Sequence, residues 1–307
     1  WNAARFALMN LGEELAFRPL SLGDLSSEDR WILSRLSKTT RTVTGHLEAY
    51  NPSAAIGAAR DFFWSELCDW YLELIKPRMK DEALAPVARQ VLAVAVEQVL
   101  RLLHPFVPFV TEVIWEQLNG QAPQRGIEAP LPASAGCILA AFPVPHPEWE
   151  DAELEAEFAR LQDVTRELRN VRSNYNVPPK KALPAAIEGK GEALASLERL
   201  GVHLRNLANL SSLEFGESVS VPENSATGVA GPAKFYLGDV LDPVKERERL
   251  GKEQEKLQKA ITSCEKKLGN ERFVAKAPPE VVESEQQRLV DLRGQLEAVE
   301  EGLAALA

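Results

Sequence analysis

Three arginines recur at intervals of three residues within the segment ELEAEFARLQDVTRELRNVRSNY, at Arg166, Arg169 and Arg172. Two lysines, Lys180 and Lys181, follow a Pro-Pro pair a few residues later. Because residues three apart share one side of a helix, this pattern predicts a basic row that could neutralise the phosphates of a nucleic acid. The alternative is a solvated face whose arginines pair with neighbouring carboxylates, and such exposed pairs are common and weak.

A second group near the N-terminus could read bases rather than phosphates. It consists of Asn2, Arg5, Arg30 and Trp31. Asn and Arg side chains can hydrogen-bond base edges, and an aromatic ring can stack on a base that is splayed out of a single-stranded loop. The alternative is that Trp31 belongs to the core and that the arginines lie on the surface. Large aromatic side chains are more often buried than exposed.

A third group surrounds Phe273 in the segment NERFVAKAPPEVVESE. Four cations lie near it in the chain, namely Lys266, Lys267, Arg272 and Lys276. The aromatic ring could stack on exposed bases while the cations bind phosphates. Alternatively, the ring could fold back and plug the open end of a helical hairpin.

The sequence offers no catalytic apparatus of a familiar kind. It has no phosphate-binding glycine loop, no Gly-x-Ser-x-Gly motif and no cysteine or histidine spacing typical of metal ligands, so we expect no catalytic and no metal-binding residues. The three cysteines are isolated, which favours a reducing, cytoplasmic compartment. The net charge of −10 means that any nucleic-acid surface must arise from local segregation of positive charge.

The elements that must position these residues are mostly helices. Apolar periodicity predicts a helical bundle over residues 1–118, with Ser26 or Ser27 as N-cap of its second helix and Pro86 in the first turn of its fourth. The expected helices cover 1–11, 26–50, 54–76, 86–104 and 106–118. The third helix should bury one face, formed by Phe63, Leu67, Trp70, Tyr71 and Leu74.

Beyond the bundle the composition changes twice. Residues 119–150, rich in Pro, Gly and Ala, predict a linker that wraps the bundle, with a short extended piece at 137–141. Residues 151–241 predict a small α/β unit that begins with a long helix. Its strands are expected at 183–187, 213–215 and 234–237, with a helix at 193–207 between the first two.

The segment 242–307 predicts an antiparallel coiled-coil hairpin. Two runs of apolar residues with heptad spacing flank a Pro-Pro pair, and a proline break between two seams of similar length favours a helical hairpin. At ~1.5 Å per residue, its arms would project ~40 Å. The apolar positions are Leu250, Leu257, Ile261, Cys264 and Leu268 in the first arm, and Val282, Leu289, Leu292, Leu296, Val299, Leu303 and Leu306 in the second.

Several motifs in order resemble a known family. WNAARF, DRWILSRL, FFWSELCDWYLELIKPR and LLHPFVPFVTEVIW resemble the anticodon-binding bundle of class I aminoacyl-tRNA synthetases for branched aliphatic amino acids. RNVRSNYNVPPKK looks like the segment that follows this bundle in valyl-tRNA synthetases, and LGNERFVAKAPPEVVESEQQRL is similar to their C-terminal coiled-coil arm. The resemblance covers nearly the whole chain, and is weakest at 119–135 and 186–232.

The resemblance implies a tRNA-binding region divided among the three parts. In the family the bundle receives the anticodon loop near the starts of its first two helices, which matches Asn2, Arg5, Arg30 and Trp31. The intermediate unit lies beside the tRNA body, which suits the arginine row. The arm reaches the outer corner of the tRNA, where the D and T loops meet. We therefore expect tRNA(Val) as partner, and no DNA, no membrane and no second copy of the chain.

The family's HIGH and KMSKS motifs, which hold ATP, do not occur in these residues. Since the chain also begins at Trp1 without a methionine, we expect a C-terminal fragment that binds no cofactor, whereas the full-length enzyme would use ATP and Mg²⁺ to join valine to tRNA. Two alternatives stay open. One is a helical-hairpin scaffold that binds a protein partner, and the other is the equivalent region of an isoleucyl- or leucyl-tRNA synthetase.

Overall fold

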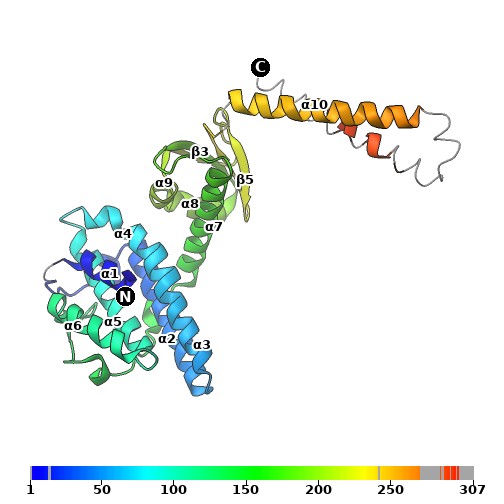
Figure 1. The fold of residues 1–307 in the computed structure, drawn as a ribbon. Coiled ribbons are helices and arrows are strands. Elements are labelled where there is room, and N and C mark those ends of the chain that lie inside the picture. The colour runs from blue at the N-terminus through cyan, green and yellow to red at the C-terminus, as the bar shows by residue number, and fades with distance from the viewer. Residues whose placement is uncertain are drawn as a thin grey trace. The chain divides into compact units, whose positions relative to one another are not determined.

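The structure is a computed structural model (Figure 1). It describes residues 2–12, 15–240, 243–269, 284, 287–290, 292–294 and 296. The described part is mostly helical with small sheets, as the sequence predicts. None of its described helices is both long and apolar enough to cross a membrane.

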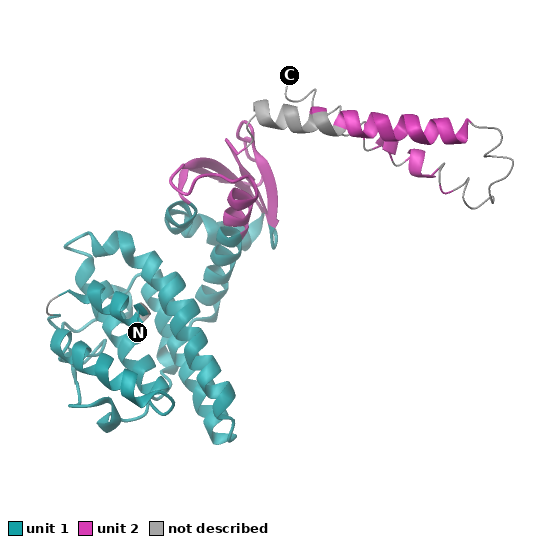
Figure 2. Ribbon diagram, in the orientation of Figure 1, with its two compact units in different colours: residues 1–166, 190–208, 230–232 teal, residues 167–189, 209–229, 233–307 magenta. Residues whose placement is uncertain are grey.

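The chain divides into two compact units (Figure 2). The first comprises residues 1–166, 190–208 and 230–232, and the second comprises 167–189, 209–229 and 233–307. The division into bundle, linker, α/β unit and arm stays a prediction.

The first unit is built around one buried helix. Helix α5, Ala85–Leu103, is apolar on nearly all sides, as expected of a helix that is surrounded by others. It contacts five helices of the same unit, α1 Asn2–Leu11, α2 Ser27–Glu48, α3 Pro52–Asp61, α4 Leu72–Met79 and α6 Pro108–Gln121. The same unit also contains α8 Gly191–Arg199 and α9 Gly201–Ala208, which replace the single helix expected at 193–207.

Local signals set the starts of these helices. Ser26 precedes α2 as its N-cap, and its hydroxyl and backbone N–H both donate to Asp29 Oδ2, at 2.9 and 3.3 Å. Asn51 caps α3 by accepting from the backbone N–H of Ala54 at 3.1 Å. The start of α5 next to Pro86 agrees with the prediction from the sequence.

The third predicted helix differs from expectation in its middle. Between α3 and α4 the chain forms a π-helical segment, Phe62–Tyr71, whose wider turn changes which side chains meet the core. Phe62 is consequently buried and Phe63 only half-buried, whereas a regular helix would have buried Phe63. The other four residues of the predicted face are buried as expected.

The segment between α6 and α7 is a wrap with little regular structure. It contains a two-stranded antiparallel hairpin, β1 Gln124–Arg125 and β2 Leu131–Pro132, which the sequence did not indicate. The extended piece expected at 137–141 is wrong. Cys137–Leu139 form a 3-10 turn, because the Glu112 carboxylate accepts from the backbone N–H groups of both Cys137 and Ile138, at 2.9 and 2.8 Å.

Helix α7, Ala152–Asn174, is followed in the second unit by a four-stranded sheet with strand order β4-β3-β6-β5. β3 pairs in parallel with β4 and antiparallel with β6. The three strands expected from the sequence are present, and β5 was missed because it lies in a stretch that reads as a Gly/Ser/Pro-rich loop. The strands are β3 Leu183–Glu188, β4 Leu210–Gly216, β5 Ala226–Ala230 and β6 Ala233–Leu237.

Helix α10, Pro243–Leu268, forms the first arm of the predicted hairpin. Ile261 and Cys264 are buried in it, and the described apolar positions of the return segment are half-buried. Arg293 Nη2 contacts Glu265 Oε1 at 2.7 Å, so the return segment lies against α10 in this region.

Candidate nucleic-acid interface

The exposed face of α1 carries two of the predicted base-reading residues. Asn2 and Arg5 are both exposed, and Phe6 and Met9 lie on the same side of the helix. The Phe6 ring is 42% exposed, and the ammonium group of Lys76 lies 5.9 Å from its centroid. A cation beside an exposed aromatic ring is the combination that stacks bases and binds phosphates in single-stranded nucleic acids.

Sequence reasoning did not single out Phe6, although a signal was present. The buried residues of α1 are Ala4, Ala7, Leu8 and Leu11, which follow helical spacing. Phe6 lies off that stripe, so its exposure could have been predicted from the period alone.

The structure corrects the expectation for Trp31. Its side chain is only 3% exposed and stacks on Phe158 of α7, with ring centroids 5.1 Å apart and planes 15° apart. Trp31 is therefore a core residue and is not available to stack on a base. Its neighbour Arg30 is exposed and forms an ion pair with Asp151 at 2.6 Å.

A groove of about 510 Å³ lies between α2, the π-helical segment and α7 in the first unit. Arg35 forms a bidentate ion pair with Glu66 on its wall, at 2.7 and 2.8 Å. Arg166 also lines the groove, where its guanidinium lies 5.5 Å from the Trp70 ring centroid and 2.7 Å from an Asp163 oxygen. The groove thus combines aromatic surface with arginines that are already paired to carboxylates.

Buried charges fix the start of α2 against α4. Arg78 Nη1 contacts Glu28 at 2.9 Å and Asp29 at 2.8 Å, and donates to Ser26 Oγ at 2.6 Å. Tyr71 donates its hydroxyl hydrogen to Asp29 Oδ1 at 2.7 Å. Such a network is stable only while its buried groups stay paired.

The surroundings shift the pKa values of the two carboxylates of this network, Glu28 and Asp29, in opposite directions. Burial opposes ionisation of Glu28, but its contact with His203 at 3.3 Å and the charge of Arg78 together lower the pKa of Glu28 to about 2. Burial raises the pKa of Asp29, because Arg78 and the hydrogen-bond donors only partly compensate for the lost hydration.

The arginine row separates into exposed and buried members. Arg166 and Arg169 are exposed. Arg172 is only 7% exposed, and its Nη2 donates to the carbonyl oxygens of Pro178 and Lys181, at 3.2 and 2.6 Å. The expectation that Arg172 contacts a nucleic-acid backbone is therefore corrected, because its guanidinium is used to hold the turn after α7. Burial also lowers the pKa of Arg172.

This turn positions the two predicted lysines. Lys180 is exposed at its tip. Lys181 is exposed too, and its Nζ donates to the Asp239 carbonyl oxygen at 2.8 Å. Both remain accessible to a phosphate.

At the end of α10, Lys266 and Lys267 are exposed, in the last turn of the helix. The other three residues predicted for the arm tip, Arg272, Phe273 and Lys276, lie outside the described residues. The choice between a stacking and a plugging role for Phe273 therefore stays open.

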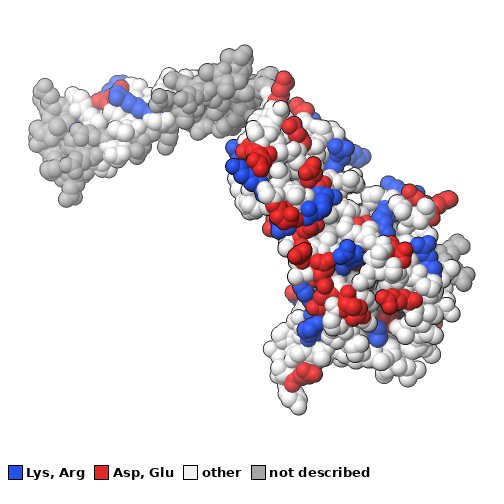
Figure 3. Space-filling view, turned by 180° about the vertical axis from the view of Figure 1, so that it is seen from behind, with Lys and Arg blue, Asp and Glu red and all other residues white. Residues whose placement is uncertain are grey.

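On the one face drawn in Figure 3, the charged side chains of the described residues are intermixed in sign. Among those residues no cluster of His, Cys, Asp or Glu could hold a metal ion. The exposed candidates are thus local groups, namely the α1 face, Arg166 with Arg169, the lysines after α7 and the lysines that end α10.

Comparisons with known proteins agree with this arrangement. Residues 29–187 match the family described as anticodon-binding domain of tRNA ligase, and residues 242–307 match that described as valyl tRNA synthetase tRNA binding arm. Relatives named valine–tRNA ligase occur in Rhodopirellula baltica (36% identical over 312 residues), Syntrophotalea carbinolica (38% over 314) and Clostridium acetobutylicum (37% over 311).

These alignments cover 100% of this chain but only 30–34% of each relative, so the chain spans about a third of their length. Two family matches cover the bundle and the arm, and the relatives align over the whole chain. The chain belongs to the valyl-tRNA synthetase family, of which it contains the anticodon-binding domain and the tRNA-binding arm.

Proposed function

We propose that this chain binds tRNA(Val) and positions it for a valine–tRNA ligase. The observation that carries the proposal is the presence, in one chain, of matches to an anticodon-binding domain and to a tRNA-binding arm. We assign the activation of valine with ATP and Mg²⁺ to parts of the ligase other than this chain. The same proposal places the chain in the cytoplasm, as a monomer that binds neither DNA nor membranes.

Identity of the tRNA is read, in this proposal, by the exposed face of α1. Asn2 and Arg5 have free access to base edges, and Phe6 replaces Trp31 as the aromatic surface on which an unpaired anticodon base stacks. Lys76 beside Phe6 would bind an adjacent phosphate. Arg30 contributes only if it exchanges its ion pair with Asp151 for RNA.

Affinity comes from cations that contact the tRNA backbone. We assign this role to Arg166, Arg169, Lys180 and Lys181, which are all exposed. At the arm we assign it to the exposed Lys266 and Lys267, and from sequence alone to Arg272 and Lys276, whereas Phe273 would stack on an exposed base. Each contact that neutralises a phosphate should release counterions and make binding depend on salt.

Fluorescence anisotropy of labelled tRNA(Val), titrated with the chain at several salt concentrations, tests the proposal. If only the six backbone cations of the described residues contact phosphates, log K should fall with log[salt] at a slope of about −4 to −5, since each contact contributes ~0.7 to 0.9, and every further contact steepens the slope. A chain that instead docks a protein partner through packed helices would bind tRNA weakly and without this slope. Equal affinity for tRNA(Ile) or tRNA(Leu) would contradict selectivity for tRNA(Val).

The base-reading role is tested by Phe6→Ala. Loss of one stacked base costs ~1–3 kcal/mol, so the affinity for tRNA(Val) should fall about 5- to 150-fold with the salt slope unchanged. Met9→Ala is the matched control, because Met9 is also an exposed apolar residue of α1 but offers no ring. Equal effects of the two substitutions would contradict a stacking role for Phe6.

A further inference from the structure

The exposed face of α6 begins with apolar side chains. Phe109 is 89% exposed, and Val113, four residues later on the same side of the helix, is also exposed. The helix contains two carboxylates, Glu112 and Glu116, and no lysine or arginine. Its buried side is formed by other residues, namely Thr111, Ile114, Trp115 and Leu118.

A second exposed apolar group adjoins this face. In the 3-10 turn Cys137–Leu139 the side chains of Ile138 and Leu139 are each 72% exposed. The turn lies against α6, because the Glu112 carboxylate accepts from the backbone N–H groups of Cys137 and Ile138. An exposed apolar surface to which neighbouring elements contribute is typical of an interaction site. We refer to four residues as the α6 patch, namely Phe109, Val113, Ile138 and Leu139.

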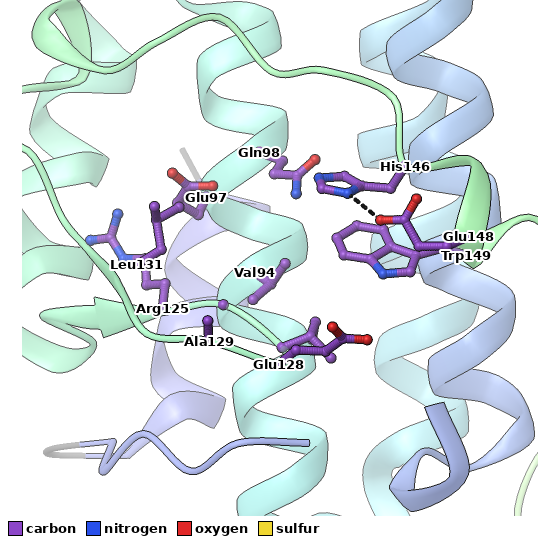
Figure 4. A pocket seen from close by; sticks show the side chains of 12 residues that line it. Val94, Glu97, Gln98, Arg125, Glu128, Ala129, Leu131, His146, Glu148 and Trp149 are labelled. Carbon is purple, nitrogen blue, oxygen red and sulfur yellow. Dashed lines mark hydrogen bonds and ion pairs between the residues drawn. The ribbon is translucent and has the colours of Figure 1, made fainter. Parts of the chain in front are cut away.

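The segment that carries the turn is fixed on both sides of it. Before the turn, the Ser134 carbonyl accepts from Trp115 Nε1 at 2.9 Å. After the turn, the segment reaches a cavity of about 230 Å³, where the His146 ring stacks on Trp149 and pairs with Glu148 (Figure 4). The α6 patch is therefore a preformed surface, and docking on it requires little ordering of the chain.

The distribution of charge disfavours RNA on the α6 patch. Residues 129–145 include no lysine, arginine or carboxylate, in a chain of which 26% of the residues are charged. Since α6 also lacks cations, neither element can neutralise a phosphate, and Glu112 and Glu116 would repel one. A surface without charges and with an aromatic side chain at hand is typical of a contact with protein.

The length of the relatives indicates which protein surface this is. This chain spans about a third of their length, so about two thirds of a ligase of that size lies outside it. A part that is tethered to this chain has a high effective concentration, so a patch of a few side chains is enough to hold it. A free partner or a second copy would need a standard interface, about 800 Å² on each side.

We propose that the α6 patch docks an uncharged, apolar surface of the same ligase polypeptide, in the part that lies outside this chain. Phe109 and Ile138 are the central contacts, because they are the most exposed residues on their elements. The inference rests on the proposed function, since it takes the chain as one part of a longer ligase. It uses none of the residues assigned to tRNA.

Alkylation of an introduced thiol, in the isolated chain and in the complete ligase that contains it, tests the proposal. Ile138→Cys places the thiol in the α6 patch. Val202→Cys, on α9, is the matched control, because Val202 is also 72% exposed. The two thiols should react at similar rates in the isolated chain. In the ligase the thiol at position 138 should react about tenfold more slowly or less, and that at position 202 at an unchanged rate.

Equal alkylation of position 138 in the isolated chain and in the ligase would overturn the proposal. Protection that is already present in the isolated chain, and increases with its concentration, would also overturn it, because a second copy would then be the occupant. Protection that requires added tRNA(Val) would overturn it in favour of RNA.

A second variant tests the contact itself without relying on the stability of the fold. Phe109→Ser should leave urea unfolding of the isolated chain unchanged, since the ring is exposed there. In the ligase that carries Ile138→Cys, it should raise alkylation at position 138 about threefold or more. Tyr50→Ser is the matched control, because Tyr50 is an exposed aromatic residue at the turn between α2 and α3, and it should leave the protection intact. Full protection in Phe109→Ser would overturn the role of Phe109.

Failure of this inference is distinguishable from failure of the proposed function. The isolated Phe109→Ser chain should bind tRNA(Val) with the wild-type affinity, because the α6 patch is not assigned to RNA. Loss of tRNA binding in that variant would overturn the inference. A wild-type chain that binds no tRNA would contradict the proposed function, whereas the alkylation of position 138 in the ligase would still decide whether the α6 patch is covered.

Discussion

Arg78→Met should destabilise the first unit by about 3 kcal/mol. The Arg78 side chain is 14% exposed, and the side chains of its partners Glu28 and Asp29 are 3% and 0% exposed. Removing one partner of a buried ion pair costs ~3–5 kcal/mol, because the other charge stays buried and unpaired. The lower end applies, since His203 still contacts Glu28 and Tyr71 still donates to Asp29.

Urea unfolding followed by tryptophan fluorescence measures this loss. All six tryptophans lie in the first unit, so the signal reports that unit. The control is Arg60→Met, because Arg60 is exposed and its ion pair among the described residues is with the exposed Asp61. Such surface pairs contribute ~0–1 kcal/mol. A loss below ~1 kcal/mol for Arg78→Met would refute the reasoning.

The pH dependence provides a second test of the same variant. In the wild-type chain the pKa of Glu28 is lowered to about 2 from an ordinary 4.5, so its contribution to stability is present above pH 4.5 and is lost as the pH falls towards 2. Without Arg78 the buried carboxylates hold protons more tightly in the folded state. The stability difference between the two proteins should therefore shrink from pH 7 to pH 4, and a constant difference would contradict the account.

Three further changes test other parts of the structure. Arg172→Met removes the donor that holds the Lys181 carbonyl, so amide hydrogen exchange should rise about tenfold at 180–182, a loss of ~1.4 kcal/mol. Gly126→Ala should cost ~2 kcal/mol or more in urea unfolding, because Gly126 has a φ of 122° and an added Cβ would lie 2.1 Å from the Ala129 carbonyl oxygen. Burial raises the pKa of Cys68 to about 12, so its alkylation at pH 8 should be about a thousandfold slower than that of a thiol with the ordinary pKa of 9.

Each of these predictions has a matched control. Arg169→Met removes an exposed arginine of the same helix and should leave exchange at 180–182 unchanged. Gly45→Ala, within α2, places its Cβ in open space and should be neutral or stabilising. For Cys68 the control is the urea-unfolded chain, and equal alkylation of the folded and unfolded chains would contradict burial of the thiol.

Much of the fold follows from local sequence signals. The helical period, the cap at Ser26, the first-turn Pro86 and the heptad positions Ile261 and Cys264 agree with the structure because they depend on residues close in the chain. The π-helical segment could not be predicted, since it depends on how Phe62 and its neighbours fit the core of the bundle.

The candidate site was predicted less completely. Trp31 and Arg172 have residue types suited to RNA, but their burial depends on Phe158 and on the turn after α7. Neither partner can be assigned from spacing, because these are tertiary contacts. The exposure of Phe6, in contrast, could have been predicted, because it follows from the helical period of the buried residues of α1.

Chemical footprinting of tRNA(Val) in the presence and absence of this chain tests the central claim most directly. The account predicts protection of the anticodon bases by the α1 face and of the outer corner by the arm, with the corner protection decreasing first as salt rises. Phe6→Ala should remove the protection at the anticodon and leave that at the corner. A tRNA without protection at either place, at concentrations where the chain is in excess, would contradict the account.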